Sequence, residues 1–124
     1  MTEAFYQDNI LKKKGVRMYI SFEDFSKLSL KVGAIKEVSP HPNADKLYVL
    51  KVSLGDKEIQ LVAGIRKSYS PEELLNKQIV VLENLEPKVI RGVKSEGMLL
   101  AVCTEEGPVI LIPEKKVIPG LPIA

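Results

Sequence analysis

Apolar and polar residues follow one another along most of the chain in the short runs that are typical of β-strands. From residue 28 onward these runs are separated by segments rich in proline, glycine, asparagine and aspartate. We expect strands at residues 30–38, 47–54, 58–63, 79–83 and 97–104, followed by a sixth apolar stretch at residues 109–112. The pair Gly55-Asp56 fits a type II′ turn between the second and third strands, and Gly33 inside the first strand indicates a bend or a bulge.

One short helix is indicated between the third and fourth strands. Ser70 is a suitable N-cap, Pro71 occupies the first helical position and Glu73 completes a capping box. Three strands, one short helix and two further strands are the order of an all-β OB-fold, a five-stranded Greek-key barrel. In that fold the ligand face lies across the second and third strands. It is flanked by two loops, which are residues 39–46 and 84–96 here.

The N-terminal part of the chain has a different pattern. Residues 1–15 fit a short helix, and residues 16–22 alternate between apolar and polar with the period of a strand. Ser21 then fits the cap of one further helical turn. We therefore divide the chain into an N-terminal extension at residues 1–21 and an OB-fold domain at residues 22–124.

Composition excludes several classes of protein. Hydrophobic residues make up 45% of the 124 residues and charged residues 27%, which is a globular composition rather than a disordered or fibrous one. The longest apolar run, Met98 to Cys103, is far shorter than the roughly 20 residues of a membrane span, and the N-terminus has no secretory signal. The single cysteine excludes an internal disulfide. We expect a soluble, cytoplasmic protein with no membrane partner.

Positive charge is concentrated in two stretches, although the formal net charge is only +2. Residues 27–51 hold five lysines against two acidic residues, and residues 87–97 hold three basic residues against one acidic residue. These stretches include or border the two loops of the expected ligand face, which points to an anionic ligand. Beyond residue 25 only Tyr48 and Tyr69 are aromatic, and Tyr48 could equally belong to the core. Because single-strand binders stack bases on several aromatic side chains, a folded RNA fits better.

Side chains suited to catalysis or metal binding are scarce. A structural zinc site needs about four Cys or His ligands, whereas the chain contains one of each. Cys103 ends an apolar run and fits a buried small hydrophobe, while His41 lies between two prolines and fits a residue that shapes a turn. Motifs of nucleotide-binding loops, nucleophile elbows and zinc proteases do not occur. We expect a binding module that is not an enzyme and has no cofactor or metal.

Five blocks of the sequence resemble, in their order and spacing, the family of tRNA-binding domains. These blocks are Leu30–Ile35, His41–Leu47, Val62–Ile65, Asn84–Lys88 and Arg91–Met98. The family includes stand-alone tRNA-binding proteins, the C-terminal module of dimeric methionyl-tRNA synthetases and the cytokine-like endothelial monocyte-activating polypeptide. The resemblance covers residues 22–124. It implies an OB-fold homodimer that binds the outer corner of folded tRNA without strong sequence preference.

The same resemblance implies tRNA contacts for two residues of the second block and two of the fifth. Lysine can pair with a phosphate, and Asn or Ser can bond phosphate or 2′-hydroxyl oxygens. The charge pattern adds the basic residues of loop 84–96, and Gly97 directly after this loop permits close backbone approach. The predicted RNA-binding residues are Asn43, Lys46, Lys88, Arg91, Lys94, Ser95, Gly97 and Met98. Simpler roles stay open: Asn43 can shape its turn, Met98 can belong to the core, and the basic side chains can form a solvated loop.

The C-terminal part of the chain, about residues 108–124, is more apolar than the exterior of a small barrel requires. We expect it to be buried against a second copy, as the resemblance implies, although it could also fold back over its own barrel. The residues predicted to form the dimer interface are Val109, Ile110, Leu111, Ile112, Val117 and Ile118.

These observations together favour a non-catalytic protein that recognises folded tRNA by its shape and backbone. It would act alone or as an auxiliary module of methionyl-tRNA synthetase, so its expected partners are tRNA, a second copy and an aminoacyl-tRNA synthetase. Two alternatives stay open. One is a dimeric peptide-binding export chaperone of the CsaA type, and the other is an assembly module that docks a synthetase through residues 1–21.

Overall fold

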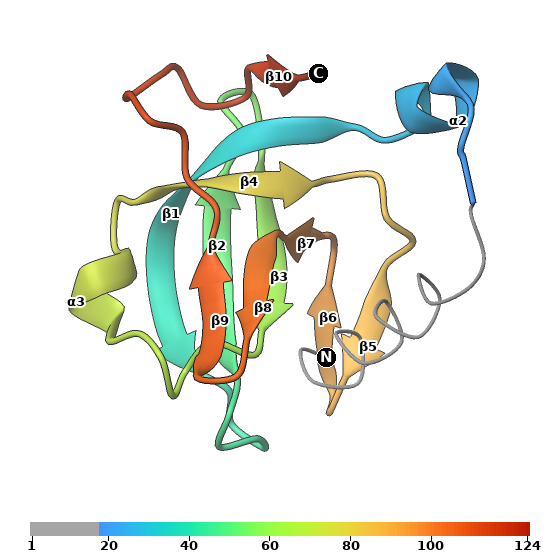
Figure 1. Ribbon diagram of the computed structural model, residues 1–124. Coiled ribbons are helices and arrows are strands. Elements are labelled where there is room, and N and C mark those ends of the chain that lie inside the picture. The colour runs from blue at the N-terminus through green and yellow to red at the C-terminus, as the bar shows by residue number, and fades with distance from the viewer. Residues whose placement is uncertain (1–17) are drawn as a thin grey trace.

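The computed structural model describes residues 18–124 and consists mainly of short strands (Figure 1). The helix predicted for residues 1–15 lies outside the described residues. In chain order the elements are α2 (Phe22–Ser26), β1 (Leu30–Pro40), β2 (Tyr48–Ser53), β3 (Glu58–Ala63), α3 (Pro71–Leu74), β4 (Gln78–Leu82), β5 (Lys88–Ile90), β6 (Val93–Ser95), β7 (Met98–Leu99), β8 (Ala101–Thr104), β9 (Gly107–Ile110) and β10 (Pro122–Ile123). No helix among the described residues is long and apolar enough to cross a membrane.

The strands form a nearly closed barrel. The main sheet has the order β3-β2-β1-β4-β7, and β10 adds to β1. Two hairpins, β5–β6 and β8–β9, are separate sheets. Both β6 and β7 contact β3, which brings the two edges of the main sheet together. The all-β OB-fold predicted from the sequence, with its short helix between the third and fourth strands, is confirmed.

The long first strand bends as its glycine predicts. A Cβ atom at Gly33 would lie 2.5 Å from the side chain of Val52, so only glycine allows β1 to pack this closely over β2. The pairing of β1 with β2 then shifts register between Ile35 and Glu37, which is the bulge expected in this strand. This curvature lets β1 pair with β2 at one end and with β4 at the other.

Local turn and cap signals also act as predicted. Gly55 has φ +88°, whereas Asp56 has no positive φ, and this is the pattern of a type II′ turn between β2 and β3. Ser70 and Glu73 form a reciprocal capping box at the start of α3. Near the N-terminus, the Ser21 hydroxyl accepts a hydrogen bond from the Asp24 amide at 3.0 Å and caps α2.

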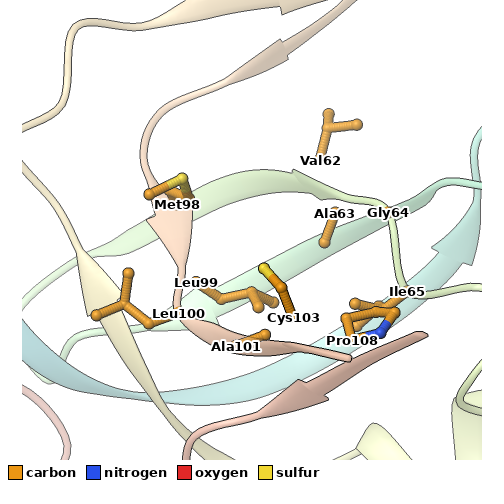
Figure 2. A pocket seen from close by; sticks show the side chains of 10 residues that line it. All are labelled: Val62, Ala63, Gly64, Ile65, Met98, Leu99, Leu100, Ala101, Cys103 and Pro108. Atoms are coloured by element: carbon orange, nitrogen blue, oxygen red, sulfur yellow. The ribbon is translucent and has the colours of Figure 1, made fainter. Parts of the chain in front are cut away.

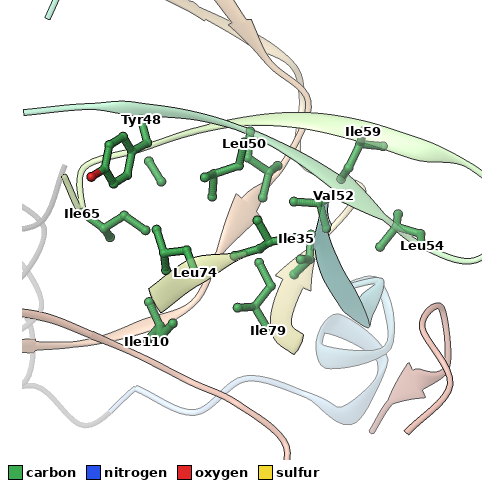
Figure 3. Packing of buried hydrophobic residues seen from close by; sticks show 13 residues of the cluster. Ile35, Tyr48, Leu50, Val52, Leu54, Ile59, Ile65, Leu74, Ile79 and Ile110 are labelled. Atoms are coloured by element: carbon green, nitrogen blue, oxygen red, sulfur yellow. The ribbon is translucent and has the colours of Figure 1, made fainter. Parts of the chain in front are cut away.

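The interior is an aliphatic cluster that joins β1, β2, β3, β4, α3 and β9 (Figure 3). Alternate residues of β2 point inward, so Tyr48, Leu50 and Val52 are buried while the residues between them are half-buried. Tyr48 is therefore a core residue, and its hydroxyl donates to the Tyr69 carbonyl at 2.8 Å. Without an exposed ring on β2, base stacking has no platform there.

The strand predicted at residues 16–22 is wrong where it can be compared. Residues 18–21 form no strand, and Phe22 already belongs to α2. Alternating apolar residues make a strand only when a partner strand and a core lie beside them, yet Tyr19 is 84% exposed here.

Two predicted segments near the C-terminus also differ from the structure. Residues 84–96, predicted as a loop, contain the β5–β6 hairpin. The strand predicted at residues 97–104 is broken at Leu100, whose amide bonds to Val80 while its carbonyl accepts from Leu111. The chain changes partner at this point, from β4 to β9, and so becomes two short strands, β7 and β8.

Candidate nucleic-acid interface

The loop of residues 41–47 and the β5–β6 hairpin lie together at one end of the barrel. His41 Nε2 is 2.9 Å from the Ile90 carbonyl oxygen. The side-chain amide of Asn43 donates to the Arg91 carbonyl at 3.2 Å, and the Arg91 guanidinium donates to the Asn43 carbonyl at 3.0 Å. Two basic stretches about 48 residues apart in sequence thus form one surface.

A tight turn joins the two strands of the hairpin. Arg91 has φ +51° and Gly92 has φ +90°, and two consecutive positive φ values are the pattern of a type I′ turn. Arginine is an unusual first residue in this turn, because a side chain in the left-handed region costs roughly 1 kcal/mol. The turn places an exposed guanidinium at the tip of the hairpin.

Strand β6 of the hairpin is attached to β3, at the edge of the barrel. The Ser95 hydroxyl accepts from the Val62 amide and donates to the Gly97 carbonyl, each at 3.0 Å. The Glu96 carboxylate accepts from the Gln60 amide at 2.9 Å. These two side chains therefore satisfy the edge amides of β3 that a further strand would otherwise bond.

The predicted site residues divide into exposed and structural ones. Asn43, Lys46, Lys88, Arg91 and Lys94 are exposed, and within residues 18–124 none of the four cations forms an ion pair.

Ser95, predicted as an RNA ligand, is only 5% exposed and has both its donor and its acceptor occupied. Gly97 faces the barrel rather than solvent, because a Cβ atom there would lie 2.7 Å from the Leu82 carbonyl. Met98 is half-buried. Of these three residues, only Met98 offers side-chain surface to a ligand.

The three basic residues of the hairpin do not form one patch. Side chains alternate between the two faces of a strand, and residues directly paired across two strands share a face. Val89 pairs with Lys94, and both are exposed on the outer face. Lys88 pairs with the buried Ser95 and thus belongs to the opposite face. Arg91 lies at the turn between these faces.

Arg66 is a cation near this site that sequence reasoning missed. Its guanidinium lies 3.4 Å from the Ala44 carbonyl and so adds a positive charge beside loop 41–47. The residue follows β3, 22 positions from the loop, and no local pattern signals this contact. Only the return of the chain after β3 brings it there.

An apolar pocket of about 100 Å³ lies next to Met98, between the end of β3 and the β7–β8 segment (Figure 2). Its lining is Val62, Ala63, Gly64, Ile65, Met98, Leu99, Leu100, Ala101, Cys103 and Pro108. Cys103 is half-buried in this lining, where its sulfur adds to the apolar wall. Within residues 18–124, no three His, Cys, Asp or Glu side chains gather in a way that could hold a metal ion.

The residues predicted to form a dimer interface have different environments. Ile110 is 8% exposed and belongs to the core, because the alternation of β9 turns it inward and Val109 outward. Val117 is half-buried, and its amide donates to the Gln78 side chain at 2.9 Å. Leu111, Ile112 and Ile118 stay exposed.

The last residues of the chain fold back over their own barrel. This is the second of the two arrangements considered for the C-terminal part, the first being burial against a second copy. The Gly120 amide donates to the Val32 carbonyl at 2.7 Å, and β10 pairs with β1 at Leu30 and Lys31. Within residues 101–124, exposed apolar side chains remain on the β8–β9 hairpin and in the segment that follows it.

Comparisons with known proteins agree on the kind of domain. Residues 30–122 match the family described as "Putative tRNA binding domain". A methionine–tRNA ligase of Pyrococcus abyssi is 58% identical over 106 residues, which make up 86% of this chain and 15% of the ligase. A methionine–tRNA ligase of Nanoarchaeum equitans is 45% identical over 114 residues, which make up 92% of this chain and 15% of that protein. The chain thus spans about 15% of the length of these relatives.

Solved structures show the same fold. A MetRS related protein from Pyrococcus horikoshii is 33% identical with a TM-score of 0.80, and the match covers 88% of this chain and all of that one. A CsaA chaperone protein from Picrophilus torridus is 38% identical with a TM-score of 0.80, and the match covers 86% of this chain and all of that one.

Proposed function

Because the chain belongs to the family of tRNA-binding domains, we propose that it is a non-catalytic module that binds folded tRNA by its shape and backbone. The observation that carries this proposal is the contact between loop 41–47 and the β5–β6 hairpin, which joins the two basic stretches in one surface. Phosphates of a folded RNA lie at fixed distances, so a preformed pair of basic loops suits them.

The side chains proposed to contact tRNA are the exposed members of the predicted set other than Lys88, which lies on the opposite face of the hairpin, together with the half-buried Met98. Lys46, Arg91 and Lys94 supply cations for phosphates. Asn43 keeps its side-chain oxygen, Oδ1, for a 2′-hydroxyl, since its side-chain NH₂ group is bonded to Arg91. Met98 offers an apolar contact for a sugar or base.

The chain acts either as a stand-alone protein or as an auxiliary domain of methionyl-tRNA synthetase. The methionine–tRNA ligases named above are proteins of which it spans about 15%, whereas the whole solved chain of the MetRS related protein from Pyrococcus horikoshii matches 88% of this chain. In both settings the module would raise the local concentration of tRNA for a synthetase.

The proposal is tested by titrating the protein with folded tRNA and with single-stranded RNA of equal length at two salt concentrations. We expect tRNA to bind more tightly and its affinity to fall steeply with salt, because each phosphate contact releases counterions. The double variant Lys46→Ala, Arg91→Ala should weaken tRNA binding. It should also make the negative slope of log affinity against log salt shallower by about 2, that is, by about 1 for each lost phosphate contact.

The matched control is the double variant Lys115→Ala, Lys116→Ala, which removes the same charge from two exposed lysines of the C-terminal segment. It should bind tRNA almost as the parent protein does. Equal losses in the two double variants would mean that only total charge matters. Equal affinity for folded and single-stranded RNA would contradict shape recognition.

A second candidate function is peptide binding of the kind implied by chaperones of the CsaA type. The apolar pocket beside Met98 favours it, since such a pocket accommodates an aliphatic side chain of an unfolded polypeptide. Suppression of the aggregation of an unfolded client, in a protein that binds no tRNA, would support this function instead.

A third candidate is an assembly module that docks a synthetase. The observation that favours it is three exposed apolar side chains in the described part of the predicted arm, which are Met18, Tyr19 and Ile20. Residues 1–17, the rest of the predicted arm, lie outside the described residues.

We also propose that the functional unit is a homodimer. Val102 and Val109 are paired on the outer face of the β8–β9 hairpin and are 50% and 49% exposed. Leu111, Ile112 and Ile118, in the segment that follows the hairpin, are also exposed. A second copy related by two-fold symmetry would remove apolar surface of this kind from water.

A further inference from the structure

His41 is buried although it lies in an exposed loop. Its side chain is 3% exposed, whereas Pro42 and Asn43 beside it are exposed. The Asn43 amide donates to Nδ1 at 2.9 Å, and the Ile90 carbonyl oxygen lies 2.9 Å from Nε2. A backbone amide can only donate and a carbonyl can only accept, so the ring proton must be on Nε2. The imidazole thus holds its own loop through one nitrogen and β5 through the other.

Three hydrogen bonds between side chain and backbone join loop 41–47 to the hairpin, and the one from His41 is the most protected. The two bonds between Asn43 and Arg91 are exposed to solvent. Water competes for exposed hydrogen bonds, whereas a bond in a buried site is stronger and its loss leaves an unpaired group. The His41 bond to Ile90 is therefore the main constraint on how the two segments lie.

Of the two strands of the hairpin, only β5 depends on the bond between His41 and Ile90. β6 is fastened to β3 through Ser95 and Glu96, but the contacts of β5 are chiefly with β6. In Figure 1 the hairpin stands beside the barrel rather than within its sheet. Without the bond to Ile90, only the two solvent-exposed bonds between Asn43 and Arg91 would hold the turn beside loop 41–47.

We propose that His41 is a positioning residue that holds loop 41–47 and the β5–β6 hairpin as one tRNA-binding surface. This inference rests on the proposed function, because it concerns how that surface is assembled. In this proposal the ring does not contact RNA. Its bond to Ile90 fixes the position of Arg91, the next residue, and its bond to the Asn43 amide fixes the conformation of the loop that carries Lys46.

Two substitutions separate this role from the shaping of the turn alone. In His41→Gln, the side-chain NH₂ occupies the position of Nε2 and can still donate to Ile90, but the acceptor near Asn43 is lost. In His41→Asn, the side-chain oxygen occupies the position of Nδ1 and can still accept from Asn43, but the side chain does not reach Ile90. Each variant thus keeps one of the two bonds.

The measurement is tRNA affinity at fixed salt for the parent protein and both variants, with melting temperatures to compare their folds. We expect His41→Gln to stay within about threefold of the parent and His41→Asn to bind about tenfold more weakly, as the loss of one buried hydrogen bond predicts. If His41→Asn binds as well as His41→Gln, or better, the ring only shapes its own turn and the inference is overturned.

The parent protein gives a reading that needs no variant. Nitrogen-15 spectra should show the ring proton on Nε2, in slow exchange with water, and its signal should shift with the hairpin amides when tRNA is added. A rapidly exchanging ring proton would contradict the bond to Ile90. Failure of the proposed function is distinct, because the parent protein would then not bind tRNA at all, whatever the ring does.

Discussion

At the scale of single residues, Glu83 at the end of β4 concentrates the strongest ionic contacts of the described chain. Its carboxylate lies 2.7 Å from the Lys31 ammonium and 3.1 Å from the Lys57 ammonium, and it accepts from the Ser29 hydroxyl at 2.7 Å. These donors lower the pKa of Glu83 from 4.5 to about 2, while the carboxylate raises the pKa of Lys31. The cluster ties β1 and β4 to the turn of the β2–β3 hairpin.

The lowered pKa of Glu83 predicts a loss of stability in acid. In the unfolded chain the carboxyl titrates near its ordinary value of 4.5, so its contribution is complete above that pH and disappears as the pH falls to about 2. We expect Glu83→Gln to lower the free energy of unfolding by about 2 kcal/mol at pH 7, with the difference vanishing near pH 2. Urea denaturation at several pH values measures this.

The control for that experiment is Glu105→Gln, because Glu105 is exposed in the turn between β8 and β9. It should leave the free energy of unfolding unchanged within about 0.5 kcal/mol. A Glu83→Gln effect that persists at pH 2 would show that the substitution disturbs packing rather than an ionic contact.

At the scale of elements, the β5–β6 hairpin, which is the proposed binding segment, contains a turn that its own sequence disfavours. A type I′ turn favours Asn-Gly, yet this chain has Arg91-Gly92. Strain of this kind persists where the residue has another task, and the guanidinium at the tip of the hairpin fits the proposed contact with phosphate.

We expect Arg91→Asn to change stability and tRNA binding in opposite directions. The melting temperature should rise slightly, because asparagine adopts the left-handed conformation at lower cost, by up to about 1 kcal/mol. The affinity for tRNA should fall, and the negative slope of log affinity against log salt should become shallower by about 1. Thermal denaturation and tRNA titrations measure the two effects.

Arg91→Lys serves as its control, since it keeps the charge and a side chain that disfavours the turn. It should leave the melting temperature unchanged and retain the salt slope. If Arg91→Asn binds tRNA like the parent protein, Arg91 makes no contact with phosphate.

At the scale of the whole molecule, the apolar surface on β8–β9 is what the barrel leaves uncovered. Val102 and Val109 point away from the core while Ala101 and Ile110 point toward it, as the alternation of a hairpin requires. Contiguous exposed apolar side chains mark places where another protein chain can bind.

The dimer predicts a mass in solution of about twice the 13.8 kDa of one chain. Val109→Glu should shift it to the monomer, because a charge buried without a partner opposes association. Light scattering after gel filtration measures this. The control is Lys36→Glu, which changes an exposed residue of β1 and should leave the mass in solution the same as that of the parent protein. A monomeric parent protein would remove the dimer from the proposal.

The sequence by itself determined the features that depend on near neighbours. The capping box of Ser70 and Glu73 and the turn at Gly55 join residues no more than three positions apart, so local patterns are sufficient to predict them. Five apolar runs, with one short helix between the third and the fourth, were likewise sufficient to predict the barrel, and five blocks were sufficient to indicate the family.

Tertiary structure alone decided which of the candidate residues are exposed and which are buried. Ser95 bonds to Val62, 33 residues away, and His41 bonds to Ile90, 49 residues away. The residues next to a polar side chain in the sequence do not indicate whether that side chain will form a hydrogen bond with a distant backbone group. The need for such a bond arises only when folding removes water from the group, and it made Ser95 and His41 structural residues while Lys46 and Arg91 stayed at the surface.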